Sequence, residues 1–282
     1  MHPAFSNRNP LILGLLQITL GKLNRGKMTI YSHSRISTFE QCPLKYKFQY
    51  IDKLTPDIKQ TIESFLGNMV HKTLQWIYNE VLQGRIPQLD EVIEFYITSW
   101  RADFGDEIKI VNQEYDVEYY FNKGIKFLID YFLSNSPFQD NTIETEKKIL
   151  IPLDSECKYI IQGYIDRLVH HKDTNIFEIH DYKTTSSMKA QEELDKDRQL
   201  ALYSLGIRHM FQNVADVHLV WHFLAFNEKI ISRRTPEQLK RLKQEIIELI
   251  KRIESTTKFK SNSGALCQWC EFQSHCPEIN KK

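Results

Sequence analysis

Apolar residues recur at helical spacing along the first part of the chain. Within Phe65–Val81 they stand four, four, three and four residues apart, counted from Leu66, which is the period of a helix with one buried face. Two further helices are predicted over Leu89–Trp100 and Tyr115–Leu133. A short helix is expected before them, with Ser34 or Ser37 as a candidate cap. The front of the chain is therefore predicted to be helical.

The pattern then changes to β-branched and aromatic runs that are separated by turn residues. Three consecutive strands are predicted to form a meander over Thr142–Leu153, Lys158–His170 and Asn175–Lys183. The later predicted elements are a helix over Gln191–Met210, a strand pair around Val217–Phe226 and Lys229–Arg233, and a helix that opens at Thr235. These elements predict an α/β fold with a mixed central β-sheet flanked by helices and an N-terminal helical elaboration.

Length and composition indicate one domain with insertions. The chain has 282 residues, of which 41% are hydrophobic and 26% are charged, as in ordinary globular proteins. Its net charge of +1 means that any nucleic-acid binding must use a local basic surface. Residues 1–27 are basic and contain no acidic residue, and we expect a non-essential extension with Met28 as an alternative start. A single domain is expected over 28–282, with a helical insertion at about 64–135 and a C-terminal cysteine segment at about 257–282.

Two carboxylates and an amine are predicted to meet on neighbouring strands. Asp166 lies in the second predicted strand, and Asp181 and Lys183 end the third. Because side chains alternate along a strand, Asp181 and Lys183 share one face. Hard oxygen ligands bind Mg²⁺ or Mn²⁺ and a lysine can orient a nucleophile, a combination that suits phosphodiester hydrolysis. A lone Asp-x-Lys is more often a surface salt bridge, so this interpretation depends on the motifs around it.

Four cysteines lie near opposite ends of the chain. Cys267 and Cys270 form a C-x-x-C pair that Cys276 follows closely, and Cys42 is more than two hundred residues away. This spacing suits one metal ion or iron–sulfur cluster better than a set of disulfides. Four thiolates also satisfy a structural Zn²⁺. The remaining Cys157 lies near a predicted turn and is expected to be an ordinary free thiol.

Five motifs occur in a recognisable order. They are Ser34-Arg-Ile-Ser-Thr-Phe-Glu-Gln-Cys42-Pro-Leu-Lys-Tyr46, Gly67-Asn-Met-Val-His71, Gly163-Tyr-Ile-Asp166-Arg167, Asp181-Tyr-Lys183-Thr and Gln199-Leu-Ala-Leu-Tyr203. Together they resemble the RecB-type branch of the PD-(D/E)XK nuclease superfamily, over about Tyr31 to Pro277. The resemblance implies a restriction-endonuclease-like core. The chain departs from the family at Val169, where many relatives carry an acidic residue, and at Thr184-Thr185.

The resemblance implies a role for each residue of the site. His71, Asp166, Asp181 and the backbone carbonyl of Tyr182 would bind Mg²⁺ or Mn²⁺. Lys183 would position the attacking water and help to deprotonate it. The pair formed by Gln199 and Tyr203 would contact the substrate strand or the lysine. A helical histidine is by itself more often structural, and an amphipathic helix with an incidental glutamine is the alternative for the last pair.

In the cluster-bearing subset of this branch, one cysteine precedes the metal-binding histidine and three follow the last core helix. Cys42, Cys267, Cys270 and Cys276 fit that layout, so the resemblance favours a structural [4Fe–4S] cluster over Zn²⁺. Reduced thiols are needed to bind either group, which predicts a cytoplasmic location, nucleoid-associated in a prokaryote.

The resemblance also implies a substrate, since relatives of this kind cut DNA, often as single-strand exonucleases. Aromatic and basic residues between Phe39 and Phe48, including Lys45, Tyr46 and Lys47, could hold a single strand or could be core and solvated face. The sequence contains no phosphate-binding loop, so we predict that it does not unwind DNA. Possible partners are a helicase or a repair or CRISPR protein. The alternatives are a CRISPR-associated adaptation nuclease and a non-catalytic DNA-binding subunit of a repair complex.

Overall fold

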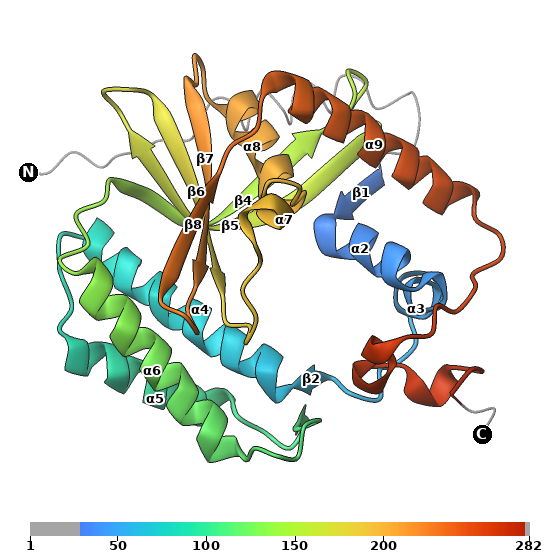
Figure 1. Ribbon diagram of the computed structural model, residues 1–282, viewed down its shortest axis with the longest axis horizontal. Coiled ribbons are helices and arrows are strands. Elements are labelled where there is room, and N and C mark those ends of the chain that lie inside the picture. Colours follow the sequence, from blue (N-terminus) through green and yellow to red (C-terminus); the bar gives the residue numbers. More distant parts are fainter. Residues whose placement is uncertain (1–28, 280–282) are drawn as a thin grey trace, which may run out of the picture.

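A six-stranded mixed sheet forms the centre of the protein (Figure 1). The computed structural model describes residues 29–279, so the predicted extension over residues 1–27 lies outside the described residues. The strands are β1 (Thr29–Ser32), β4 (Thr142–Pro152), β5 (Tyr159–His171), β6 (Ile176–Lys183), β7 (Asp216–Phe223) and β8 (Glu228–Ser232). They follow the order β1-β5-β6-β7-β8, and β4 pairs with β5. The predicted mixed α/β fold is confirmed.

Strand β5 organises the sheet. It pairs antiparallel with β4 and with β6, which is the predicted meander, and parallel with β1. The β1 partners are residues 159–162 of β5, whereas the β6 partners are residues 167–171. The segment 163–166 lies between these two sets of partners. A carboxylate in that segment can therefore meet the end of β6, where the backbone ladder to β5 has stopped.

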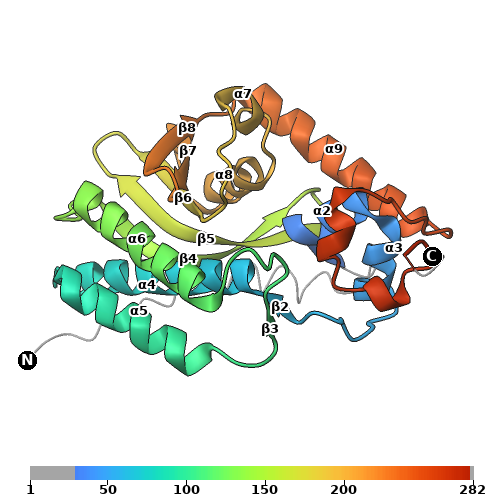
Figure 2. The same cartoon turned by 60° about the horizontal axis from the view of Figure 1, so that its bottom comes forward.

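Helices cover both faces of the sheet (Figure 2). One face carries α4 (Ile62–Leu82), α5 (Leu89–Asp103) and α6 (Val117–Asn135), and the other carries α2 (His33–Gln41), α8 (Gln199–Met210) and α9 (Pro236–Ser255). Each layer has its own buried apolar cluster. The short elements are α3 (Pro43–Tyr46), α7 (Gln191–Leu194), the π-helix η1 (Lys47–Ile51), the strands β2 (Gln60–Thr61) and β3 (Ile108–Lys109), and the 3₁₀ turns η2 (Ala265–Trp269) and η3 (Gln273–His275).

Capping explains where several helices begin. Thr235 caps α9, with Pro236 at its first position and Gln238 completing a capping box, as the sequence predicts. Helix α2 begins earlier than expected, because Ser32 rather than Ser34 accepts the capping hydrogen bond. The helix predicted over Gln191–Met210 is two helices, α7 and α8, because the chain turns between them at residues 195–198.

The C-terminal segment packs beside the first helices of the chain (Figure 1). Asn262 donates to the Gln41 carbonyl at 2.8 Å, and the backbone N–H of Leu44 donates to the Lys260 carbonyl at 3.1 Å. Further along, the backbone N–H and the hydroxyl of Ser274 both contact the Asp57 carboxylate, at 2.8 and 2.5 Å. The segment with three cysteines therefore lies against the turn that holds Cys42.

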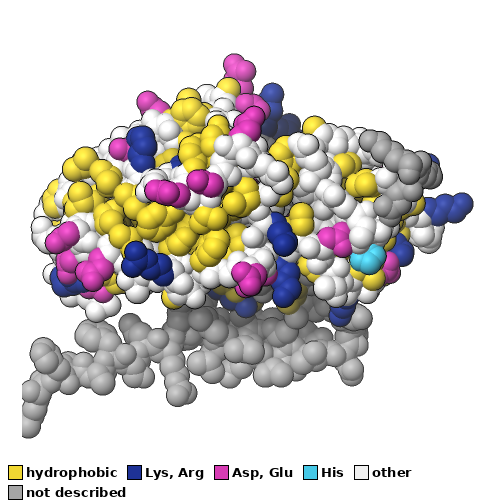
Figure 3. Space-filling view, turned by 90° about the horizontal axis from the view of Figure 1, so that it is seen from below, with side chains coloured by type: hydrophobic (Ala, Val, Ile, Leu, Met, Phe, Trp, Pro, Cys, Tyr) yellow, Lys and Arg dark blue, Asp and Glu magenta, His cyan; other side chains and the backbone are white. Residues whose placement is uncertain are grey.

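Apolar side chains gather on the face seen in Figure 3. The aromatic rings of Tyr115 and Tyr119, which precede and open α6, stack at 4.0 Å and are each more than a third exposed.

None of the helices in residues 29–279 has the length and hydrophobicity needed to cross a membrane.

Candidate metal-binding active site

Helix α4 carries His71 to the end of β6. A side chain at Gly67 would place its Cβ atom 3.3 Å from the Thr184 hydroxyl. The absence of that side chain lets the helix approach the residues that follow β6. Gly67 and His71 stand four residues apart, on one face of the helix. This close approach positions the imidazole over the strand that holds Asp181 and Lys183.

The His71 ring lies between a backbone carbonyl and a carboxylate. Its Nε2 atom is 2.8 Å from the Tyr182 carbonyl oxygen, and its Nδ1 atom is 3.3 Å from Asp166 Oδ2. The backbone N–H of Tyr182 donates to the same carboxylate oxygen at 3.0 Å. Adjacent ligands of an octahedral ion at about 2.1 Å are themselves about 3 Å apart. The structure thus brings His71, Asp166 and the Tyr182 carbonyl to the spacing that a small divalent cation requires.

A proton is shared within this group. Since His71 donates through Nε2 to the Tyr182 carbonyl, its Nδ1 atom can meet Asp166 Oδ2 only if one of the two carries a proton. Burial raises the pKa of Asp166 to about 7, the His71 imidazole opposes that rise, and the Asp181 carboxylate adds to it. A bound cation would displace the proton, because metal ligands must be deprotonated.

Asp181 and Lys183 form the second half of the site. Their side chains share one face of β6, as the alternation predicts, and Lys183 Nζ lies 2.7 Å from Asp181 Oδ2. Burial opposes the charge on Lys183, but the Asp181 carboxylate holds the pKa of the ammonium above its ordinary value. Asp181 is 5% exposed, and about a third of the Lys183 side chain remains accessible. The ammonium can therefore donate hydrogen bonds to a group that enters from solvent.

Glu146 joins this site although the sequence motifs do not include it. Its carboxylate, with His71 and Asp166, forms the one group of three His, Cys, Asp or Glu side chains in residues 29–279 whose ligand atoms all lie within 4.8 Å. Glu146 stands opposite Asp166, between the pairs Thr145–Arg167 and Lys147–Ile165. Its φ of 46° is left-handed, a conformation that non-glycine residues seldom adopt within a strand. The donor set therefore gains a carboxylate from β4, whereas Asp181 lies outside this group of three.

The strands are irregular at this pair. Asp166 contacts His71, and the next residue, Arg167, lies over the ring of Tyr78, 4.2 Å from its centroid. His71 and Tyr78 belong to the same helix, so two consecutive side chains of β5 meet one face of the sheet, where regular alternation would separate them. This irregularity delivers both an acidic ligand and a buried cation to α4.

Helix α8 places Gln199 and Tyr203 on the other side of β5. Tyr203 is 6% exposed, and a Cβ atom at Gly163 would lie 2.3 Å from its ring. Burial raises the pKa of Tyr203, and its hydrogen bond with Gln199 opposes that rise. The glycine of the Gly163–Arg167 motif therefore makes room for the tyrosine, three residues before Asp166.

The segment Phe39–Phe48 is core rather than a binding surface. Phe39 is 5% and Tyr46 is 2% exposed, and the two rings meet edge to face at 5.4 Å. Lys45 pairs with Glu271 at 2.5 Å, and Lys47 pairs with Asp52 at 2.6 Å. Of the two alternatives for this segment, the structure favours core for the rings of Phe39 and Tyr46, while the two lysines are paired at the surface.

The cysteines of the two chain ends are free thiols that share one region. Cys42 stands between α2 and α3, where its Sγ accepts from the backbone N–H of Lys45 at 3.5 Å. Cys267 Sγ accepts from Gly264 N at 3.3 Å. Burial raises the pKa of Cys270, the Phe272 N–H opposes that rise, and the nearby Cys42 adds to it. Cys42 and Cys270 are therefore electrostatic neighbours despite their distance in sequence.

Comparisons with known proteins give a family match and a similar fold. The family model of the PD-(D/E)XK nuclease superfamily matches residues 30–277. A solved structure of a candidate exonuclease from Eubacterium rectale has a TM-score of 0.51 and 9% identity, over 99% of this chain and 93% of that chain. The crystal structure of SSO0001 has a TM-score of 0.39 and 15% identity, over 98% and 99%.

No curated protein matches the chain. The likeness to the Eubacterium rectale protein concerns the fold alone, since the identity is low. The family model extends from β1 to the C-terminal cysteines, so it includes every residue of the candidate site. Members of this family are phosphodiester hydrolases that generally depend on a divalent metal ion. The chain therefore belongs to the PD-(D/E)XK nuclease superfamily.

Proposed function

We propose that this nuclease cuts single-stranded DNA with Mg²⁺ or Mn²⁺ held by His71, Asp166, Asp181 and the Tyr182 carbonyl. The observation that carries the proposal is the 2.8 Å contact of His71 Nε2 with the Tyr182 carbonyl, beside Asp166. It joins His71 on a helix to Tyr182 on a strand, two residues that are 111 positions apart. The atoms around this contact are of the type that coordinates these cations. A bound cation of this kind lowers the pKa of a coordinated water and offsets charge on the phosphate.

The residues of the chain would divide the remaining work. Lys183, kept as an ammonium by Asp181, donates to the attacking water or to a phosphate oxygen. The Asp181 carboxylate raises the pKa of the amine in the metal-free chain, and the expected help of Lys183 in deprotonating the water stays a prediction. Glu146 adds a carboxylate next to Asp166. Gln199, which is half-buried, would contact the substrate strand, and Tyr203, which is buried against Gly163, would support Gln199 through their hydrogen bond.

A single strand fits the depth of the site. The Asp166 side chain is 16% exposed and the Asp181 side chain is 7% exposed. A flexible strand can bring one phosphate to these little-exposed carboxylates more readily than a stiff duplex can. Exonuclease action in DNA repair or processing is the activity that we propose, and a CRISPR-associated adaptation nuclease remains the alternative of the same chemistry.

We also propose a [4Fe–4S] cluster bound by Cys42, Cys267, Cys270 and Cys276. Backbone N–H groups already face three of the sulfurs, and hydrogen bonds of this kind surround the sulfurs of iron–sulfur clusters. Four thiolates also satisfy a structural Zn²⁺, so the choice of the iron–sulfur cluster rests on the resemblance to the cluster-bearing branch of the family. The cluster would join the C-terminal segment to the rest of a single domain over 28–282.

The experiment is digestion of end-labelled DNA by anaerobically purified protein. We expect Mn²⁺-dependent cleavage of a linear single strand, and a loss of roughly three powers of ten or more in Asp181→Ala and Lys183→Ala. Asp130→Ala is the matched control, because Asp130 pairs with Lys126 on the surface of α6. A closed circular single strand tests whether cleavage needs a free end, and a duplex tests the preference for single strands. An RNA of the same sequence tests the preference for DNA over RNA. Full activity in both active-site variants would overturn the site.

A further inference from the structure

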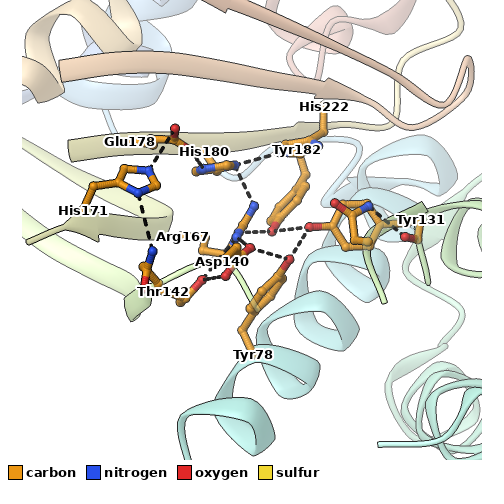
Figure 4. A network of polar contacts seen from close by, with 12 residues as sticks. Tyr78, Tyr131, Asp140, Thr142, Arg167, His171, Glu178, His180, Tyr182 and His222 are labelled. Atoms are coloured by element: carbon orange, nitrogen blue, oxygen red, sulfur yellow. Dashed lines mark hydrogen bonds and ion pairs between the residues drawn. The ribbon is translucent and has the colours of Figure 1, made fainter. Parts of the chain in front are cut away.

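A buried cation lies directly behind the candidate site. Arg167 follows Asp166 on β5 and is 1% exposed, so its guanidinium cannot reach a substrate. Burying a charge is costly unless hydrogen bonds and a counter-ion compensate for it. Arg167 makes an ion pair with Asp140 and lies over the ring of Tyr78 (Figure 4). Because the buried guanidinium cannot contact substrate, any role of Arg167 in activity must come from its contacts with neighbouring side chains.

The guanidinium holds three neighbours in fixed directions. Its Nε donates to the Tyr182 hydroxyl at 2.9 Å, and one terminal nitrogen donates to His180 Nδ1 at 2.7 Å. Because a guanidinium can only donate, His180 Nδ1 accepts from Arg167 and His180 Nε2 donates to Glu178 at 3.0 Å. The arginine therefore sets the tautomer of His180, and His222 Nε2 lies 2.8 Å from the same Nδ1 atom.

Tyr182 connects this network to the metal-binding groups. Its hydroxyl contacts Arg167 and lies 3.2 Å from the Tyr131 hydroxyl, while its carbonyl contacts His71 and its N–H contacts Asp166. The residue is thus fixed at its side chain and at both backbone groups. Figure 4 shows the ring of Tyr182 directed toward Arg167 and Tyr131. Rotation about this residue would move the carbonyl and the flanking Asp181 and Lys183 together.

We propose that Arg167 is a positioning residue, which acts through the Tyr182 hydroxyl to hold the Tyr182 carbonyl and the flanking Asp181 and Lys183 in the geometry that binds the divalent cation. This inference rests on the proposed function, since it concerns the same cation. It extends that function to a residue that touches neither metal nor substrate. The fork of an arginine is needed, because one side chain must meet Tyr182, Asp140 and His180 at once.

The test measures Mn²⁺ binding to the full chain without DNA, by electron paramagnetic resonance of the free ion. Tyr182→Phe keeps the ring and the backbone carbonyl but removes the hydroxyl, and Arg167→Lys keeps the charge but not the fork. We expect each to weaken Mn²⁺ binding roughly three- to tenfold and to lower kcat with an unchanged KM for DNA, at temperatures well below unfolding. The double variant should lose little more than either single one, because both break the same contact.

Tyr96→Phe is the matched control. Its hydroxyl is another buried donor in the same helical layer, to the Phe121 carbonyl at 3.2 Å, and its loss should lower the melting temperature without changing Mn²⁺ affinity. If Tyr182→Phe behaves like this control, Arg167 is structural only and the inference fails. Asp166→Asn is measured alongside, and unchanged Mn²⁺ binding in that variant would reject the proposed metal site itself. Should Arg167→Lys not fold, Tyr182→Phe still decides the question.

Discussion

Replacing Asp166 by asparagine should stabilise the metal-free protein while removing its activity. The folded chain takes up a proton on Asp166 near pH 7, because burial raises the pKa of that carboxyl, whereas the unfolded carboxyl does so near 3.8. Between these two values the folded chain binds more protons than the unfolded chain. Its free energy of unfolding therefore falls as the pH rises, and the loss is complete above about pH 7.

The magnitude follows from the two pKa values. The difference between 3.8 and about 7 corresponds to about 4 kcal/mol of unfolding free energy at pH 8. Asparagine carries no charge, so Asp166→Asn avoids this cost. We expect the variant to exceed the wild type by up to about 4 kcal/mol at pH 8 in EDTA, and the two proteins to converge toward pH 4.

The assay is urea unfolding followed by circular dichroism, in EDTA from pH 4 to pH 8, on samples of equal iron content. Saturating Mn²⁺ provides the second condition, since a ligand that binds only the folded state stabilises it. The wild type should gain stability from Mn²⁺ and the variant should not. The difference in unfolding free energy between the two proteins should therefore shrink or change sign. A variant no more stable than the wild type at pH 8 in EDTA would refute the reasoning, as would a difference that does not depend on pH.

Three further changes test other parts of the molecule. His71→Ala should raise the Mn²⁺ concentration for half-maximal cleavage at least about tenfold, as measured by metal titration; a changed melting temperature with an unchanged metal optimum would indicate a structural histidine. Cys42→Ala should lose the iron chromophore as completely as Cys270→Ala, and unchanged iron content and melting temperature in Cys42→Ala would reject Cys42 as a ligand that ties the two chain ends together. Gly163→Ala should cost about 1–3 kcal/mol in urea unfolding, because the new methyl group would overlap the Tyr203 ring; wild-type stability would show that α8 adjusts freely.

Much of the fold follows from local pattern. The buried stripe of α4 and the three strands of the meander are each within a few residues of their predicted bounds, because periodicity reports which face is buried. The break between α7 and α8 could not be predicted. Arg234 donates there to the carbonyls of Leu194 and Asp197, and these contacts come from a segment about forty residues later. Tertiary hydrogen bonds override helical propensity at this point.

Part of the candidate site could likewise be predicted from local pattern, and part could not. Motif spacing placed Asp181 and Lys183 together, because two residues on one strand share a face by geometry alone. Glu146 gave no signal, because a glutamate in a strand carries no motif until β4 pairs with β5 and sets it opposite Asp166. The Arg167 network was hidden as well, since its partners come from α4, α6 and three strands.

The packing of the C-terminal segment against α2 and α3 also sets an order of events during synthesis. Asn262 and Gln41 are 221 positions apart, and Ser274 and Asp57 are 217 apart. On the ribosome, the surface of the first helices therefore stays uncovered until residues 262–274 have been synthesised. Chains that stall or are cut before that point keep this early surface exposed, which makes them targets for chaperones and proteases.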